Sequence, residues 1–109
     1  MADQQIINII KNYIQLLNSE GFGISKAFLY GSFAAGNDTE SSDIDLMLLS
    51  NSLSDNDVDK KSRAWVLTRK VDSRIEPYLV NLKRFQTDDS SPLIEIVKKE
   101  GVEIEVAGV

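Results

Sequence analysis

The chain of 109 residues contains no cysteine and no histidine. Disulfide bonds, catalysis by a thiolate, zinc sites of the usual ligand set and Ser-His-Asp chemistry are therefore excluded. A metal site in this chain would have to be built from oxygen ligands, which suit Mg²⁺, Mn²⁺ or Ca²⁺.

Positive charge and long apolar runs are also scarce. The chain carries 17 acidic and 12 basic residues, for a formal net charge of −5. Because an acidic surface repels phosphate backbones, we expect no general nucleic-acid binding, although divalent cations can reverse the charge locally. No apolar stretch approaches the roughly 20 residues that span a bilayer. Residues 1–5 lack the features of a signal peptide, so we expect a cytoplasmic protein without membrane association.

What is present is ordinary for a globular protein, with 42% apolar and 27% charged residues. The length suits one hydrophobic core, so we expect a single domain over residues 1–109. Apolar periodicity and turn residues predict helices over 4–19, 56–72 and 92–101, a helical turn over 33–36, and strands over 25–30, 43–49, 74–82 and 102–106. This order predicts an α+β fold with a small mixed sheet. Pro77 places the third strand at a sheet edge or makes it irregular.

Residues 31–49 concentrate the chemistry of the chain. Gly31-Ser32 follows an apolar strand, and Asp43 and Asp45 begin the next one. Since side chains alternate along a strand, the two aspartates share one face. Burying them unpaired is unfavourable, whereas a pair of divalent cations would neutralise them. Glu76, near the start of the third strand, is the candidate for a third acid.

Gly31 and Ser32 have the properties of an anion site. Glycine permits close approach to backbone N–H groups, and serine adds a hydroxyl donor. Together with metal-binding acids, such a site indicates phosphoryl or nucleotidyl chemistry on a nucleoside triphosphate. Plainer readings remain open: a turn glycine and a helix cap at 31–32, a solvated strand start at 43–45, and an exposed acid at Glu76.

The combination of Gly31-Ser32, Gly36 and the run Ser42-Asp43-Ile44-Asp45-Leu46 resembles the signature of the DNA-polymerase-β-like nucleotidyltransferase superfamily. The small size resembles its minimal nucleotidyltransferases, the MNT proteins, which are often encoded beside a HEPN-domain partner. The resemblance covers nearly the whole chain. It implies the nucleotidyltransferase fold, with helices packed on one side of the sheet.

The resemblance also implies roles for single residues. Two Mg²⁺ ions would bind to three acids, which here are Asp43, Asp45 and Glu76. The phosphates of ATP would contact Gly31 and Ser32. Ser42 is either a further nucleotide contact or a cap of its loop. Glu76 would in addition help to deprotonate an acceptor hydroxyl.

By the same resemblance, the chain is the antitoxin of a HEPN/MNT toxin–antitoxin pair that transfers AMP to a hydroxyl of its partner, such as a tyrosine. One small domain leaves little surface to enclose both base and acceptor, so we expect a HEPN-type protein or a second copy of the chain to complete the site. Two alternatives stay open. One is the catalytic subunit of a small-molecule nucleotidyltransferase of the antibiotic-modifying type, and the other is a non-catalytic antitoxin that acts by binding. Trp65 and Tyr78 are expected to lie in the core or at an interface, and Tyr78 to share a strand face with Glu76.

Overall fold

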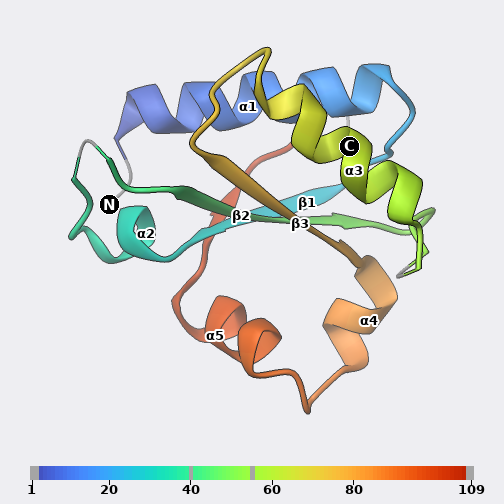
Figure 1. Ribbon diagram of the computed structural model, residues 1–109. Helices are drawn as coiled ribbons and strands as arrows, with labels where there is room; N and C mark the ends of the chain where they lie inside the picture. The colour runs from blue at the N-terminus through green and yellow to red at the C-terminus, as the bar shows by residue number, and fades with distance from the viewer. Residues whose placement is uncertain (1–2, 40, 55, 108–109) are drawn as a thin grey trace.

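The computed structural model describes residues 3–39, 41–54 and 56–107. Figure 1 shows the arrangement of its helices and strands. The strands are β1 (Lys26–Tyr30), β2 (Ile44–Ser50), β3 (Ile75–Asn81) and β4 (Val102–Ile104). The helices are α1 (Gln4–Ser19), α2 (Ser32–Ala35), α3 (Val58–Thr68), α4 (Leu82–Thr87) and α5 (Pro92–Glu100). In these ranges every helix is too short or too polar to cross a lipid bilayer.

Within the described ranges the strands form one mixed sheet in the order β3-β2-β1-β4. β1 is antiparallel to both β2 and β4, whereas β2 and β3 are parallel and connected through α3. The α+β class and the small mixed sheet are thereby confirmed. Pro77 lies in β3 at the edge of the sheet, where its missing N–H donor costs no ladder hydrogen bond.

Side-chain caps set the starts of the longer helices. The Asp3 carboxylate accepts a hydrogen bond of 2.9 Å from the Gln5 N–H and caps α1. Asp57 caps α3 in the same way, by accepting from the Lys60 N–H at 3.0 Å. The buried side chains of α1 recur at helical spacing and are Ile6, Ile10, Tyr13, Ile14 and Leu17. The predicted helix over 4–19 is therefore confirmed, while α3 is shorter than the predicted range 56–72.

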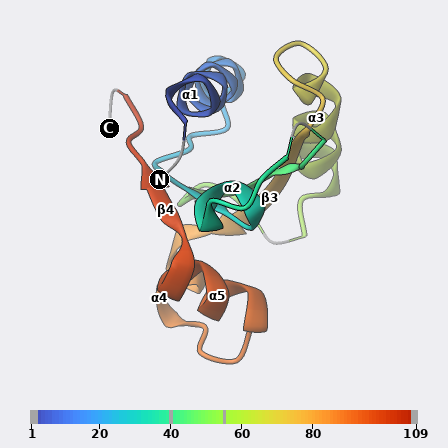
Figure 2. The same cartoon turned by 90° about the vertical axis from the view of Figure 1, so that its left-hand side faces the viewer.

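Helices cover both faces of the sheet, and the expectation of helices on one side is wrong in this respect. Leu46 and Leu48 face the core that α1 and α3 cover. Met47 and Leu49 point to the opposite face, where residues of α4 and α5 pack (Figures 1 and 2). Beyond Asp45 both faces of β2 are buried, so each needs its own cover.

The second layer includes α4, a helix absent from those predicted from the sequence. The Asn81 side chain ends β3 by accepting hydrogen bonds from the N–H groups of Lys83 (2.9 Å) and Arg84 (3.3 Å). Phe85 of α4 then stacks on Phe28 of β1, with ring centroids 5.2 Å apart. The cover over this face is incomplete toward the end of the sheet where β2 begins, and the side chains there are partly exposed.

Candidate functional site

The predicted half-sites meet at one end of the sheet. β1 ends at Tyr30, immediately before Gly31, and β2 starts directly after Asp43. The antiparallel register pairs Tyr30 with Asp45. This pairing brings the Gly31-Ser32 turn next to the aspartates, although the two segments are separated by a loop in the sequence. Figure 2 looks onto this end of the sheet, with α2 nearest the viewer and α5 below it.

The third predicted acid arrives from the neighbouring strand. In the parallel register of β2 and β3, Asp45 lies opposite Glu76. Since directly opposite residues project from the same face, Tyr30, Asp45 and Glu76 form one row across three strands. This row lies on the face that carries Met47 and Leu49, at the end that α4 and α5 leave partly open.

The carboxyl groups in this row perturb one another. A hydrogen bond with the Asp43 carboxyl, partial burial and the charges of Asp43 and Asp45 raise the pKa of Glu76 to about 7. Burial and the charge of Asp43 also raise the pKa of Asp45. Partial burial and the closeness of the carboxyl groups therefore disfavour the charged forms of Asp45 and Glu76.

Among the described residues, no three acidic side chains stand in the arrangement of a preformed metal site. The Asp43 and Glu76 carboxyl groups instead lie close enough to each other to raise the pKa of Glu76. A divalent cation that binds here would have to replace this contact. Its electrostatic gain would be the relief of repulsion among the three acids.

Tyr30 belongs to the same cluster, although its sequence position indicated only that it ends the predicted strand over 25–30. Burial, followed by the charges of Asp45, Glu76 and Tyr78, raises the pKa of Tyr30 to about 12. Its hydroxyl therefore keeps its proton at neutral pH. The position of Tyr30, last in a strand and directly before Gly31, was the available signal, but only the strand register shows that it faces Asp45.

Gly31 touches the acid site directly. Its backbone has a φ of +76° and a ψ of −148°, a conformation that side-chain-bearing residues rarely adopt. A Cβ atom at this position would overlap the Asp45 carboxylate. Glycine is therefore required both by the turn and by the acid that lies against it.

A hollow of about 420 Å³ extends from this turn. It lies between α2 and α5, and its lining residues are Gly31, Ser32, Ala34, Ala35, Asn37, Ile96 and Glu100. None of these described lining residues is basic. An anion held there would need its charge balanced by a cation rather than by lysine or arginine.

Other polar residues near the site have structural partners. The Ser42 hydroxyl accepts a hydrogen bond of 2.8 Å from the Thr39 N–H, so Ser42 caps its loop. The Arg74 guanidinium, close to the start of β3, is held by two hydrogen bonds to the Asp72 carboxylate, at 3.1 and 2.8 Å. A nucleotide contact by Ser42 remains a prediction.

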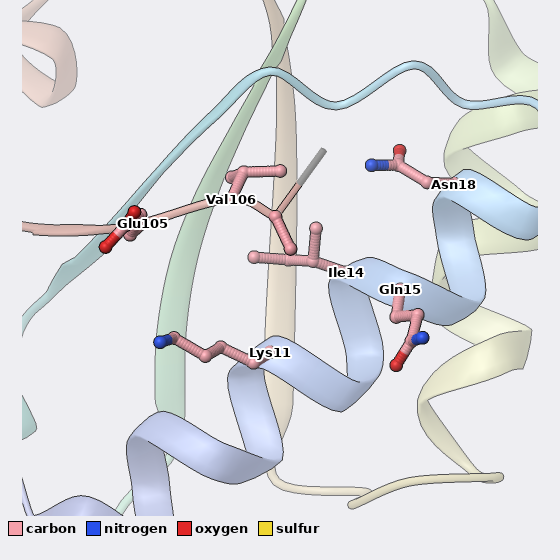
Figure 3. A pocket seen from close by; sticks show the side chains of 7 residues that line it. Lys11, Ile14, Gln15, Asn18, Glu105 and Val106 are labelled. Atoms are coloured by element: carbon pink, nitrogen blue, oxygen red, sulfur yellow. The ribbon is translucent and has the colours of Figure 1, made fainter. Parts of the chain in front are cut away.

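A separate hollow of about 490 Å³ lies on the α1 side of the molecule (Figure 3). Side chains of α1 and of the segment after β4 line it, among them Lys11, Ile14, Gln15 and Val106. It contains none of the three acids and neither residue of the Gly31-Ser32 turn. We therefore locate the candidate site at the row of acids.

Replacing Glu76 with glutamine is expected to stabilise the protein at alkaline pH when divalent cations are chelated. The unfolded chain loses this proton near pH 4.5, the folded chain only near pH 7. The contribution of Glu76 to stability therefore falls as pH rises between these values and remains unfavourable above them. Allowing for solvent screening, we expect the free energy of unfolding of E76Q to exceed that of the wild type by roughly 1 kcal/mol at pH 8. This corresponds to a rise of about 4–8 °C in Tm.

Thermal unfolding of both proteins at pH 8 and at pH 4.5 measures this effect. The difference in Tm between E76Q and the wild type should shrink toward pH 4.5. At that pH Glu76 of the folded wild type is protonated and therefore neutral, as glutamine is. Glu103→Gln, the same change on the opposite edge strand, is the control. Equal gains for E76Q and E103Q would show that only net charge had changed.

The chain matches a protein-family model along most of its length. The model of the family described as "Polymerase beta, Nucleotidyltransferase" matches residues 4–105. No curated protein sequence matches the chain significantly.

Solved structures share the fold. A Sulfolobus solfataricus protein described as a candidate nucleotidyltransferase is 14% identical, with a TM-score of 0.63 over 91% of this chain and 78% of that chain. A chain of a toxin–antitoxin complex with AMP-PNP is 24% identical, with a TM-score of 0.61 over 90% of this chain and 74% of that chain. A chain of the MntA–HpeT toxin–antitoxin complex with a tyrosine-to-alanine change is 26% identical. Its TM-score is 0.60, over 89% of this chain and 72% of that chain.

Proposed function

This chain belongs to the polymerase-β nucleotidyltransferase family, and we propose that it transfers AMP from ATP to an acceptor hydroxyl in an Mg²⁺-dependent reaction. The observation that carries the proposal is the strand register that sets Glu76 beside Asp45, while the Gly31 backbone lies against the Asp45 carboxylate. This register brings an acid cluster and a glycine turn to one end of the sheet.

The donor set suits magnesium. Asp43, Asp45 and Glu76 offer carboxylate oxygens, which hard divalent cations prefer. Burial and then the charge of Asp43 raise the pKa of Asp45, and a hydrogen bond with Asp43, burial and neighbouring charges raise that of Glu76. Bound cations would offset the part of these shifts that comes from negative charge. Bound Mg²⁺, two ions in our proposal, would neutralise charge on the phosphates and make the acceptor hydroxyl more acidic.

The other residues hold the substrates. We assign the β- and γ-phosphates to the backbone N–H groups and hydroxyl of Gly31-Ser32, next to the hollow between α2 and α5. The acceptor oxygen forms a bond to the α-phosphorus while the bond between the α-phosphorus and its bridging oxygen breaks. The electron pair leaves with pyrophosphate, and the proton of the acceptor passes to the Glu76 carboxylate.

We further propose that the chain is an antitoxin whose acceptor is a hydroxyl side chain, a tyrosine in particular, of a HEPN-type toxin in the cytoplasm. The likeness to toxin–antitoxin structures, one of them 26% identical, supports this assignment. The partial exposure of the acid row supports it as well, because a second protein could supply the missing wall. A second copy of the chain could supply the same wall.

Mass spectrometry tests the proposal. The purified chain is incubated with ATP, Mg²⁺ and a HEPN-type protein, the proposed partner. The partner is expected to gain the mass of one or more AMP groups, located on a tyrosine. If the partner gains no mass while the chain binds ATP tightly, the transfer reaction is excluded.

A contact-only antitoxin is the second candidate, and the surface of α3 favours it. Val58, Trp65 and Val66 are large apolar residues that this helix leaves exposed, which suits a protein partner. The prediction of Trp65 as a core residue is wrong, while an interface role remains a prediction. The double variant D43N/D45N separates the two functions. Retained toxin neutralisation would assign the function to contact, whereas its loss with retained binding would assign it to chemistry.

A further inference from the structure

The direction from which the acceptor arrives can be inferred from the order of the strands. Gly31 follows β1, Asp45 lies in β2 and Glu76 in β3. In an in-line displacement the entering and leaving oxygens lie on opposite sides of the phosphorus. If pyrophosphate leaves toward the Gly31 turn, the acceptor must enter from the side of Glu76. This step rests on the proposed function.

On that side the sheet ends, because β3 is an edge strand. Tyr78 is two residues beyond Glu76 and therefore projects from the same face. It lies opposite Met47, which is fully buried and belongs to the apolar cluster between the sheet and the helices α4 and α5. The next residue on this face of β3, Val80, is also fully buried.

Tyr78 differs from these neighbours because 42% of its surface is exposed. A large aromatic side chain thus borders Glu76 at the open edge of the sheet. Such a ring offers a flat surface on which another ring can stack.

We propose that Tyr78 forms the acceptor subsite and selects an acceptor whose hydroxyl is carried on an aromatic ring, namely a tyrosine side chain. The ring of the acceptor stacks on Tyr78, and its hydroxyl then lies toward Glu76. Tyr78 is a specificity-determining residue and does not take part in the chemical step. An acceptor with an aliphatic hydroxyl lacks this contact and binds more weakly.

Steady-state kinetics with two small acceptors test the proposal. N-acetyl-tyrosinamide and N-acetyl-serinamide are each titrated at saturating ATP and Mg²⁺, and pyrophosphate release is measured. For Y78A we expect the KM of the tyrosine probe to rise about 10-fold or more, as loss of ring stacking and burial predicts. The KM of ATP should not change, and Y78F should resemble the wild type.

Trp65→Ala is the matched control, because it removes another half-exposed aromatic ring from the opposite side of the sheet. It should leave both KM values unchanged. A rise in the KM of ATP rather than of the acceptor in Y78A would assign the ring to the nucleobase and overturn the proposal. Equal use of both probes by the wild type would also overturn it.

A binding measurement separates failure of this inference from failure of the proposed function. The ¹⁵N-labelled chain is titrated with each probe in the presence of Mg²⁺ and α,β-methylene-ATP, which cannot transfer AMP. The tyrosine probe should shift the amide signals of residues 76–80 in the wild type and not in Y78A. These shifts without any transfer would refute the reaction but keep the aromatic subsite. Transfer by the wild type without these shifts would refute the subsite alone.

Discussion

Replacing Asp45 with asparagine is expected to lower kcat/KM for AMP transfer by at least about a thousandfold without unfolding the protein. Asp45 lies in the middle of the row, between Tyr30 and Glu76. Loss of its charge removes a ligand from the proposed Mg²⁺ site, and metal assistance contributes several kcal/mol to such reactions. The fold should tolerate the change, because burial and the charge of Asp43 already raise the pKa of Asp45 and so disfavour its charged form.

Pyrophosphate release and thermal unfolding are measured together for this variant. Asp89→Asn is the matched control, since Asp89 is exposed in the loop between α4 and α5. The control should keep full activity, and D45N should keep a Tm at or above that of the wild type without added metal. Retention of more than about a tenth of the activity in D45N would remove Asp45 from the catalytic site.

Replacing Gly31 with alanine is expected to abolish transfer as well, for a different reason. The backbone at Gly31 is in a region that costs other residues about 1–3 kcal/mol, and the added Cβ overlaps the Asp45 carboxylate. Either the turn or the carboxylate must move. A displacement of about 1 Å at an active site can cost roughly a hundredfold in rate, so we expect at least that loss.

Gly21→Ala separates the two causes. Gly21 also has a positive φ, +85°, but a Cβ there would meet no atom within 4 Å. This control should lose about 1 kcal/mol of stability and no activity. Kinetics and Tm are measured for both variants. If G31A were active at the level of G21A, the contact between the turn and Asp45 would have no catalytic importance.

The parts of the fold that were predictable have strong local signals. α1 has an apolar stripe and the Asp3 cap, and β2 is apolar on both faces beyond Asp45. Pro77 predicted that β3 lies at a sheet edge or is irregular, and β3 is an edge strand. The short helix α4 escaped prediction because its six residues complete fewer than two turns, too few for a periodic pattern. Its presence follows from the exposed apolar face that Met47 and Leu49 would otherwise leave.

The candidate site was predictable in part. Asp43 and Asp45 could be assigned to one face because side-chain alternation is a local rule. Glu76 was proposed from its place near the start of a strand, and the parallel register sets it opposite Asp45. Tyr30 could not be found in this way. Its position facing Asp45 depends on the pairing of β1 with β2, which single-sequence patterns do not specify.

In the proposed reaction, the acid row and the Gly31 turn direct attack to the α-phosphate of ATP. The most direct test uses ATP radiolabelled in either the α- or the γ-phosphate, with Mg²⁺ and the HEPN-type partner. We predict that label from the α-phosphate becomes bound to the partner, while label from the γ-phosphate is released as pyrophosphate. Transfer of the γ-label to the partner, or release of inorganic phosphate alone, would contradict the account.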